Sequence, residues 1–450
     1  MDKLTENKFY KELPEQESVI SNYSEVENEL RKTIQRQKKT MFRLVERINK
    51  LRITCVVLVI LLVIETILLW INSGNDDKPE VPVNPEQMNN EIIDVPEPEV
   101  EDTVILDDVD EEQVNAILSQ MSLEEKICQM VFAVPEILTD VPAVTMAGES
   151  TKASLEKLPV GGVIYSQINL EDRQQVKTML ENIKSYSKIG LFLGINEEGG
   201  NNSILTKNEN VSTMSVASAD ELGSSADKSK VAETYLEIGK ELKSLGFNVN
   251  LAPVAEIATS GNTKFLSRSF GSTSSSVADM VASAVEGGLS INLSSALKYF
   301  PGESCANESG VSERTLEQLR ASEFAPFKAG IEKGADFVIL SNTTNKYIAP
   351  GGEPCSMSED VVNILRNELG FKGIVMTDVL SDSKIADVYS IEETAVKCVK
   401  AGVDMLLAPK GITKSVTAVK EAVESGEILE SSIDESVKRI LRIKLKRGIQ

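Results

Sequence analysis

The chain contains no histidine among its 450 residues. Histidine is the side chain that most often acts as a general base near neutral pH and most often ligates transition metals. Any acid–base or nucleophilic chemistry in this protein must therefore use carboxylates, lysine, tyrosine, serine or cysteine.

Basic residues are in deficit, with 47 Lys and Arg against 69 Asp and Glu, for a net charge of −22. Nucleic acid is excluded as a partner, because phosphate binding requires a basic surface. The five cysteines form no CxxC pair, which favours neither a zinc site nor a disulfide framework. We expect no metal and no cofactor. Whether Cys305 and Cys355 pair stays open, because the sequence does not give their separation.

One long apolar run, residues 53–71, has the length of a helix that crosses a bilayer. Trp70 stands at its far end, Arg43, Arg47 and Arg52 precede it, and acidic residues follow it. The positive-inside rule predicts a single-pass protein of the cell membrane, with residues 1–52 cytoplasmic and the remainder extracellular.

The segments that flank this span differ in composition. From Ser24 to Arg52 there is neither proline nor glycine, and apolar residues recur at helical spacing, which predicts an amphipathic juxtamembrane helix. That helix is either simply solvated or contacts anionic lipid or a second copy. Residues 72–105 are rich in proline and acidic residues, so we expect a disordered linker that lifts a folded domain off the membrane.

Residues 106–450 have the composition of a globular domain in which short apolar runs alternate with helical patterns. The expected strands are residues 127–132, 162–165, 191–195, 249–251, 295–298, 337–340, 374–377 and 405–407. The expected helices include residues 172–188, 229–245, 316–333, 360–368 and 391–401. Eight such units predict an α/β fold, a (β/α)8 TIM-like barrel. An open doubly wound sheet is the alternative, but no glycine-rich phosphate loop follows the first strand.

The apolar run at 374–377 ends abruptly at Asp378. Because chemistry in a parallel barrel is placed at the C-terminal tips of strands, Asp378 is a candidate catalytic carboxylate. The alternative is that it only caps the next helix. Other predicted strand tips are also polar, which favours a shared polar pocket. They are NEEGG at 196–200, Glu256, RSFG at 268–271 and KYFPG at 298–302, followed by Glu303 and Glu308.

In this order the motifs resemble glycoside hydrolase family 3, and within it the single-domain β-N-acetylglucosaminidases of bacterial cell-wall metabolism. Besides the tips above, the resemblance rests on GGVI at 161–164, LGFNVNLAPV at 245–254, EFAPF at 323–327, LGFKGIV at 369–375, AGVD at 401–404 and IDESVKRI at 433–440. It implies that Asp378 is the nucleophile of a retaining glycosidase. It further implies that Arg268 and Lys298 hydrogen-bond sugar hydroxyls, with Asn196, Glu198 and Tyr299 in the same substrate site. For Arg268 and Lys298 the alternative is a structural ion pair across the barrel mouth.

Three positions depart from the family pattern. Asn196 replaces an aspartate, and Tyr299 replaces the histidine that follows the lysine of strand five. The family's Asp–His acid/base pair on the loop after that strand is missing, since residues 303–313 read ESCANESGVSE. Glu308 lies nearest the missing pair and is the first candidate substitute, and Glu303 is the second. A retaining pair needs carboxyl groups about 5–5.5 Å apart.

Two functions follow from this pattern. One is a membrane-anchored extracellular exo-glycosidase that removes β-linked N-acetylhexosamine, or a related sugar, from cell-wall glycan. The other is a catalytically impaired barrel that keeps the glycan pocket and serves as a sensor or scaffold. In both, the partner is carbohydrate, and the membrane is met only through the N-terminal helix.

Overall fold

A computed structural model describes residues 109–449. The expected cytoplasmic region (1–52), membrane span (53–71) and linker (72–105) lie outside the described residues, so these three assignments stay predictions. In the part that is described, no helix combines the length and the apolar content that a bilayer crossing requires.

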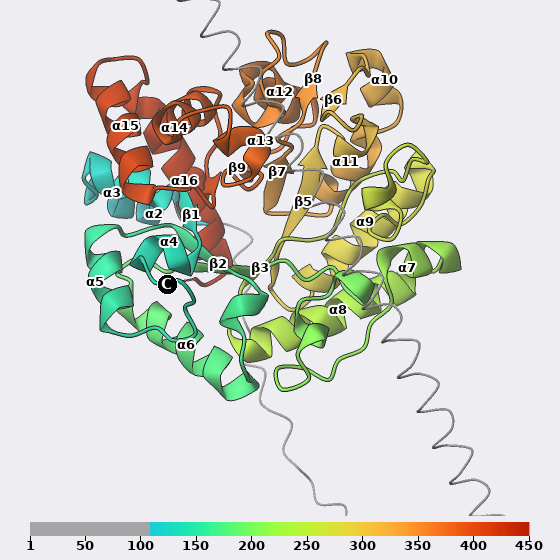
Figure 1. Cartoon of the computed structure of the whole chain (residues 1–450), viewed down its shortest axis with the longest axis horizontal. Helices are drawn as coiled ribbons and strands as arrows, with labels where there is room; N and C mark the ends of the chain where they lie inside the picture. The colour runs from blue at the N-terminus through green and yellow to red at the C-terminus, as the bar shows by residue number, and fades with distance from the viewer. Residues whose placement is uncertain (1–108, 450) are drawn as a thin grey trace, which may run out of the picture. The chain divides into compact units, whose positions relative to one another are not determined.

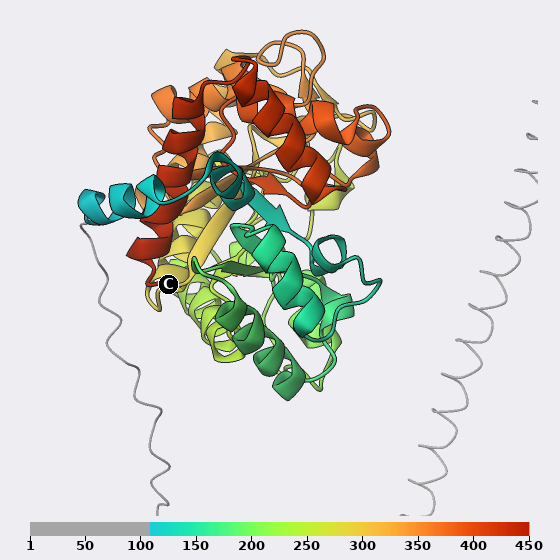
Figure 2. The ribbon, with the colours of Figure 1, turned by 90° about the vertical axis from the view of Figure 1, so that its left-hand side faces the viewer.

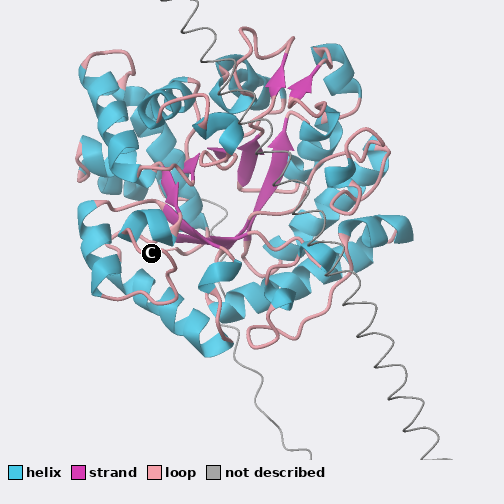
Figure 3. Cartoon of the chain, viewed as in Figure 1, coloured by secondary structure: helices cyan, strands magenta, loops and turns pink. Residues whose placement is uncertain are grey.

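Eight parallel strands form a nearly closed barrel, consistent with the predicted (β/α)8 architecture (Figure 3). They are β1 (Val131–Ala133), β2 (Gly162–Tyr165), β3 (Phe192–Ile195), β4 (Val249–Asn250), β5 (Ser294–Phe300), β7 (Phe337–Leu340), β9 (Ile374–Thr377) and β10 (Leu406–Leu407). Their order is β10-β1-β2-β3-β4-β5-β7-β9. The two ends of this sheet meet through a parallel bridge between Met376 and Met405.

Helices surround the strands (Figure 1). They are α2 (Glu111–Ser119), α3 (Leu123–Gln129), α4 (Pro135–Thr139), α5 (Glu149–Lys157), α6 (Arg173–Tyr186), α7 (Ala219–Ser225), α8 (Lys228–Leu245), α9 (Ser274–Leu289), α10 (Leu316–Ala321), α11 (Phe324–Glu332), α12 (Glu359–Asn363), α13 (Ser383–Ala386), α14 (Ile391–Lys400), α15 (Ile412–Glu424) and α16 (Glu430–Lys446). The first and last of these pack together, and Nη2 of Arg442 on α16 lies 2.8 Å from Oε2 of Glu111 on α2 (Figure 2).

Each of the eight predicted apolar runs overlaps a strand, but the predicted start of the first strand was wrong. Ile127 belongs to α3, and the strand begins only at Val131. The helix is fixed by a capping box in which the Ser122 hydroxyl accepts from the amide of Glu125 and the Glu125 carboxylate accepts from the amide of Ser122. The apolar residues before β1 therefore face the core from a helix.

Two expected helices are interrupted. Residues 316–333 form α10 and α11, separated at Ser322 and Glu323, and Pro326 in the first turn of α11 has no amide hydrogen to offer a preceding carbonyl. Residues 360–368 begin as α12 and continue as a π-helical turn, Ile364–Glu368.

The barrel interior is filled by aromatic rings that neighbouring glycines make room for. The rings of Phe192 and Phe337 meet edge to face with centroids 5.1 Å apart. A Cβ at Gly194 would lie 2.8 Å from Cζ of Phe132, so a larger residue there would displace that ring. At the floor, Asp336 and Arg447 form a buried ion pair whose Oδ2 and Nε atoms lie 2.7 Å apart. The packed interior leaves the strand tips as the place for a site.

A close approach of α7 to the loop after β4 gives the first prediction. A Cβ on Gly223 would lie 1.7 Å from the carbonyl oxygen of Phe270. Gly223→Ala must therefore push that loop away, and we expect the protein to lose about 1–3 kcal/mol of unfolding free energy, as overpacked cores do. Thermal or urea unfolding measures this loss. Gly261→Ala is the control, because no atom lies within 4 Å of its added Cβ, and equal stability of the two variants would contradict the prediction.

Candidate active site

Every candidate site residue lies at the C-terminal end of a barrel strand or in the loop that follows it. Asn196 and Glu198 follow β3, Lys298 lies in β5, and Asp378 follows β9. Arg268 is in the long loop after β4. Because parallel strands present their C-terminal ends at one face, these side chains gather at the barrel mouth.

Glu198 is the centre of this cluster. Its Oε1 atom lies 2.7 Å from Nζ of Lys298, and its two carboxylate oxygens lie 2.7 Å from Nη2 and Nε of Arg268. All three side chains are largely buried. Burial alone would raise the pKa of Glu198, but the positive charges of Lys298 and Arg268 outweigh it and lower that pKa to about 2. Glu198 is therefore ionised, and its charge is shared between two cations.

Asn196 and Tyr299 complete the cluster. The ammonium group of Lys298 donates to the side-chain oxygen of Asn196. Nη2 of Arg268 donates to the hydroxyl oxygen of Tyr299 over 3.0 Å. The five residues that the sequence assigned to the substrate site are thus brought together. The alternative for Arg268 and Lys298 was a structural ion pair across the mouth, and both side chains do form ion pairs there, with Glu198.

Two carboxylates that the sequence placed only among the polar strand tips, Glu256 and Glu197, fix the backbone of the mouth. Glu256 is buried and accepts from the amides of Tyr299, Glu303 and Ser304 over 2.8–3.0 Å. Glu197 is also buried and accepts from three backbone amides of the loop after β3. Burial raises the pKa of both carboxyls, that of Glu256 to about 6. The sequence does show that both acidic residues follow predicted strands. It does not show which backbone amides they accept from, because that depends on the fold.

Asp378 occupies the tip of β9. Its amide donates to the carbonyl of Leu340 on β7 over 2.9 Å, which holds the tip in register. The residue is half-buried, and no lysine or arginine of residues 109–449 lies within ion-pair distance of its carboxylate. Burial, and then the nearby negative charge of Glu303, raises the pKa of Asp378 to about 6. The carboxylate is therefore unpaired and ionised at neutral pH, as a nucleophile must be.

Glu303 and Glu308 differ sharply in position. Glu303 is buried, and its Oε1 lies 2.8 Å from Nζ of Lys264 and 3.7 Å from Nζ of Lys384. After burial, the negative charge of Glu303 is the next cause of the raised pKa of Asp378. Glu308, the first candidate for the missing acid, is exposed to solvent. Of the two candidates for the missing acid, Glu303 is thus buried and Glu308 lies at the surface, and which of them partners Asp378 stays a prediction.

The cysteines form no disulfide in the part of the chain that is described. Cys305 and Cys355 are both free, and Sγ of Cys305 lies 2.9 Å from Oε1 of Glu323. Burial raises the pKa of both thiols to about 12, so neither is a nucleophile at neutral pH.

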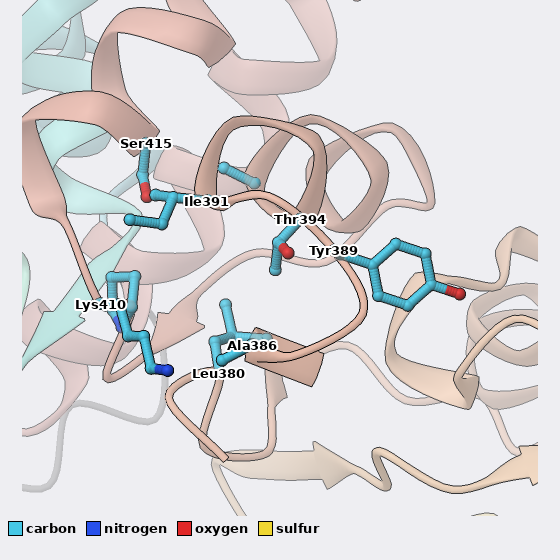
Figure 4. A pocket seen from close by; sticks show the side chains of 9 residues that line it. Leu380, Ala386, Tyr389, Ile391, Thr394, Lys410 and Ser415 are labelled. Carbon is cyan, nitrogen blue, oxygen red and sulfur yellow. The ribbon is translucent and has the colours of Figure 1, made fainter. Parts of the chain in front are cut away.

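A small pocket lies beside the tips of β9 and β10 (Figure 4). Leu380 and Ala386 face Ile391 and Thr394 of α14 across it, and the Tyr389 ring extends away from them. Its volume of about 30 Å³ holds one or two water molecules, so it is too small for a sugar ring.

The charge shared by Glu198 gives the second prediction. Glu198→Gln leaves Lys298 and Arg268 without their counter-charge, and we expect a loss of about 3–5 kcal/mol in unfolding free energy at neutral pH. Because the folded-state pKa of Glu198 is depressed from 4.5 to about 2, this contribution is present above pH 4.5 and disappears as the pH falls towards 2. The stability difference between wild type and Glu198→Gln should therefore shrink over that range. Glu124→Gln, which breaks an exposed pair with Lys420, is the control with little effect. A pH-independent difference would contradict the assignment.

Known proteins of similar sequence and fold are glycosidases by name. Among relatives by sequence, the chain is 25% identical over 327 residues to beta-hexosaminidase A of Pseudoalteromonas piscicida, covering 65% of this chain and 54% of that protein. It is 26% identical over 361 residues to a beta-N-acetylglucosaminidase/beta-glucosidase of Cellulomonas fimi, covering 76% and 61%. The chain thus spans less than two thirds of the length of these two curated relatives.

Among solved structures, the family 3 beta-N-acetylglucosaminidase of Paenibacillus sp. str. FPU-7 superposes with a TM-score of 0.68 at 31% identity, over 73% of this chain and 63% of that one. The sequence model described as "Glycosyl hydrolase family 3 N terminal domain" matches residues 122–443. The chain therefore belongs to glycoside hydrolase family 3.

Proposed function

We propose that this protein is a retaining exo-glycosidase that removes β-linked N-acetylhexosamine, or a related β-glycoside, from cell-wall glycan. The proposal rests on Asp378, because this residue is an unpaired carboxylate at a strand tip. The cluster formed by Glu198, Arg268 and Lys298 supplies charged groups of the kind that hydrogen-bond sugar hydroxyls. The names of the relatives favour the hexosamine. The apolar run at 53–71 supports anchoring of the protein in the cell membrane with the barrel outside.

In the first step the Asp378 carboxylate attacks the anomeric carbon, and the bond to the leaving-group oxygen breaks. That oxygen takes a proton from the carboxyl group of Glu303, an assignment that the burial of Glu303 supports. In the second step Glu303 takes a proton from water, the water oxygen attacks the anomeric carbon, and Asp378 is released. Arg268, Lys298 and Asn196 hold the sugar hydroxyls throughout.

Protonation of the leaving group is the step that this site is least equipped to assist. Glu303 is paired with Lys264, and this pair must open before Glu303 can carry a proton. The loop that follows β5 offers no histidine to take over that task. We therefore expect the enzyme to depend strongly on the leaving group and to work best on glycosides that need little protonation.

The third prediction concerns the nucleophile. Asp378→Asn removes the attacking carboxylate at almost constant volume and should reduce the hydrolysis of 4-nitrophenyl N-acetyl-β-glucosaminide by at least about 10³-fold. Glu308→Gln is the matched control and should keep near-wild-type activity, because Glu308 is exposed. Equal rates for wild type and Asp378→Asn on this substrate and on a panel of β-glucosides would refute the proposal.

The fourth prediction concerns Glu303. Activity that needs ionised Asp378 should decline below about pH 6 in the wild type. Glu303→Gln removes the negative charge that raises this pKa, so the acidic limb should move to lower pH. The same variant should lose about 10²-fold on a methyl glycoside and much less on the activated nitrophenyl glycoside. An unmoved acidic limb, together with equal losses on both substrates, would show that Glu303 has neither role.

A second function is favoured by the altered acid/base loop, in which Glu308 faces solvent and Glu303 is held by lysine. In that case the barrel binds wall glycan without turnover and acts as a sensor or scaffold on its linker. Calorimetry with muropeptide fragments distinguishes the two functions: heat of binding without product formation supports the scaffold, and the absence of binding removes it.

A further inference from the structure

A second cavity, which we call the rim cavity, lies at the barrel mouth between the loops that follow β5 and β7 and the helix that follows β9. Its volume is about 640 Å³, within the range of small-molecule sites. Its lining comprises Ser309, Gly310, Val311, Asn342, Thr344, Asn345, Lys346, Gly352, Pro354, Lys384, Val388 and Tyr389. None of these residues belongs to the Glu198 cluster.

The walls of the rim cavity are held by backbone pairing. The short strands β6 (Val311–Ser312) and β8 (Thr344–Asn345) pair in parallel, and Figure 1 places them beside α12 and away from the barrel ring. The amide of Thr344 also donates to the carbonyl of Gly310 over 2.9 Å. The loop after β5 is therefore joined to the loop after β7, and the cavity exists without any closing motion.

Two contacts place the rim cavity beside the reacting carboxylates. Nδ2 of Asn342 donates to the carbonyl of Val379, the residue after Asp378, over 3.0 Å. Nζ of Lys384 lies 3.7 Å from Oε1 of Glu303. A cavity that shares Lys384 with Glu303 lies on the side of the site from which a proton reaches the leaving group.

The charged residues that line this cavity are both cationic, in contrast to the acidic chain. Lys346 and Lys384 line it, and no aspartate or glutamate is among its lining residues, although the chain carries a net charge of −22. Both ammonium groups are partly open to solvent, with side-chain exposures of 57% and 47%. Their protein partners, Glu313 and Glu303, lie outside the lining, so each lysine has donors left for a ligand.

We propose that the rim cavity binds the leaving-group portion of the substrate and selects leaving groups that carry an anionic group, with Lys384 and Lys346 as its recognition residues. The inference rests on the proposed glycosidase function. The sugar that is cleaved must lie over Asp378 and against the Glu198 cluster. The group beyond the scissile bond then lies on the Glu303 side, where Lys384, with its Nζ 3.7 Å from Oε1 of Glu303, lines the rim cavity. A carboxylate or a sulfate there would meet two ammonium groups.

The test uses two substrates that differ by one carboxylate: 4-nitrophenyl N-acetyl-β-glucosaminide, and the same compound with a carboxylate on the phenyl ring. For the wild type, kcat/KM should favour the carboxylated substrate after correction for the acidity of the two phenols. Lys346→Met and Lys384→Met should each lower the ratio of the two kcat/KM values by about tenfold, the order of one partly exposed charge-assisted hydrogen bond. Lys328→Met, on the exposed face of α11, should leave the ratio unchanged. An unchanged ratio in both cavity variants overturns the inference.

The experiments distinguish a failure of the proposed glycosidase function from a failure of the proposed anion-selective cavity. If no substrate is turned over, the glycosidase proposal fails, and the rim cavity is then tested by calorimetry of Asp378→Asn with the two nitrophenyl compounds. Tighter binding of the carboxylated compound that is lost in the Asp378→Asn/Lys346→Met double variant supports an anion-selective cavity without turnover. Equal binding of both compounds, or no binding of either, overturns it.

Discussion

The barrel mouth depends on one shared counter-charge. Glu198 is the carboxylate partner of both Lys298 and Arg268, with three contacts of 2.7 Å. Two buried cations without it would have to find another anion, and Asp378 is the carboxylate whose charge already acts on Lys298. Because Glu198 holds both cations, neither of them forms an ion pair with Asp378. The proposed role of Asp378 as a nucleophile therefore depends on a residue that is not itself proposed to react.

Chemically similar side chains at this site differ in their contacts and pKa values because their surroundings differ. Glu197 and Glu256 accept backbone amides and shape the loops after β3 and β5. Glu198 is held between cations and has a depressed pKa, whereas burial and a neighbouring carboxylate raise the pKa of Asp378. A chain with no histidine can obtain groups that titrate at different pH values in this way.

Much of this arrangement was predictable from the sequence because it depends on local patterns. Apolar runs of strand length located all eight strands, and the abrupt change from Met376 to Asp378 located the tip that carries the carboxylate. The first boundary failed because a helix, fixed by the Ser122 capping box, can bury the same apolar residues as a strand. Periodicity cannot separate these two cases over so few residues.

The remaining features were not predictable because they join distant loops. Lys264 and Lys384 meet at Glu303 from the loop after β4 and the helix after β9, 120 residues apart in the sequence. No sequence pattern in either segment predicts that the two lysines share a partner. Sequence reasoning ranked Glu308 above Glu303 by its place along the chain, but the reach of a loop depends on what anchors it. Here the pairing of β6 with β8 anchors it.

That anchoring bears on how the site can work. A mobile loop can bring a proton donor to the substrate and withdraw it, and its closure can exclude water. The loop after β5 is tied at three points: by Glu256 to the amides of Glu303 and Ser304, by β6 to β8, and by Gly310 to Thr344. A donor on such a loop has little freedom to move towards the substrate. Of the two glutamates proposed for this task, Glu303 is buried and Glu308 is exposed. The same contacts form a wall of the rim cavity, so the fixed position of this loop and the proposed site for the leaving group depend on the same pairing of β6 with β8.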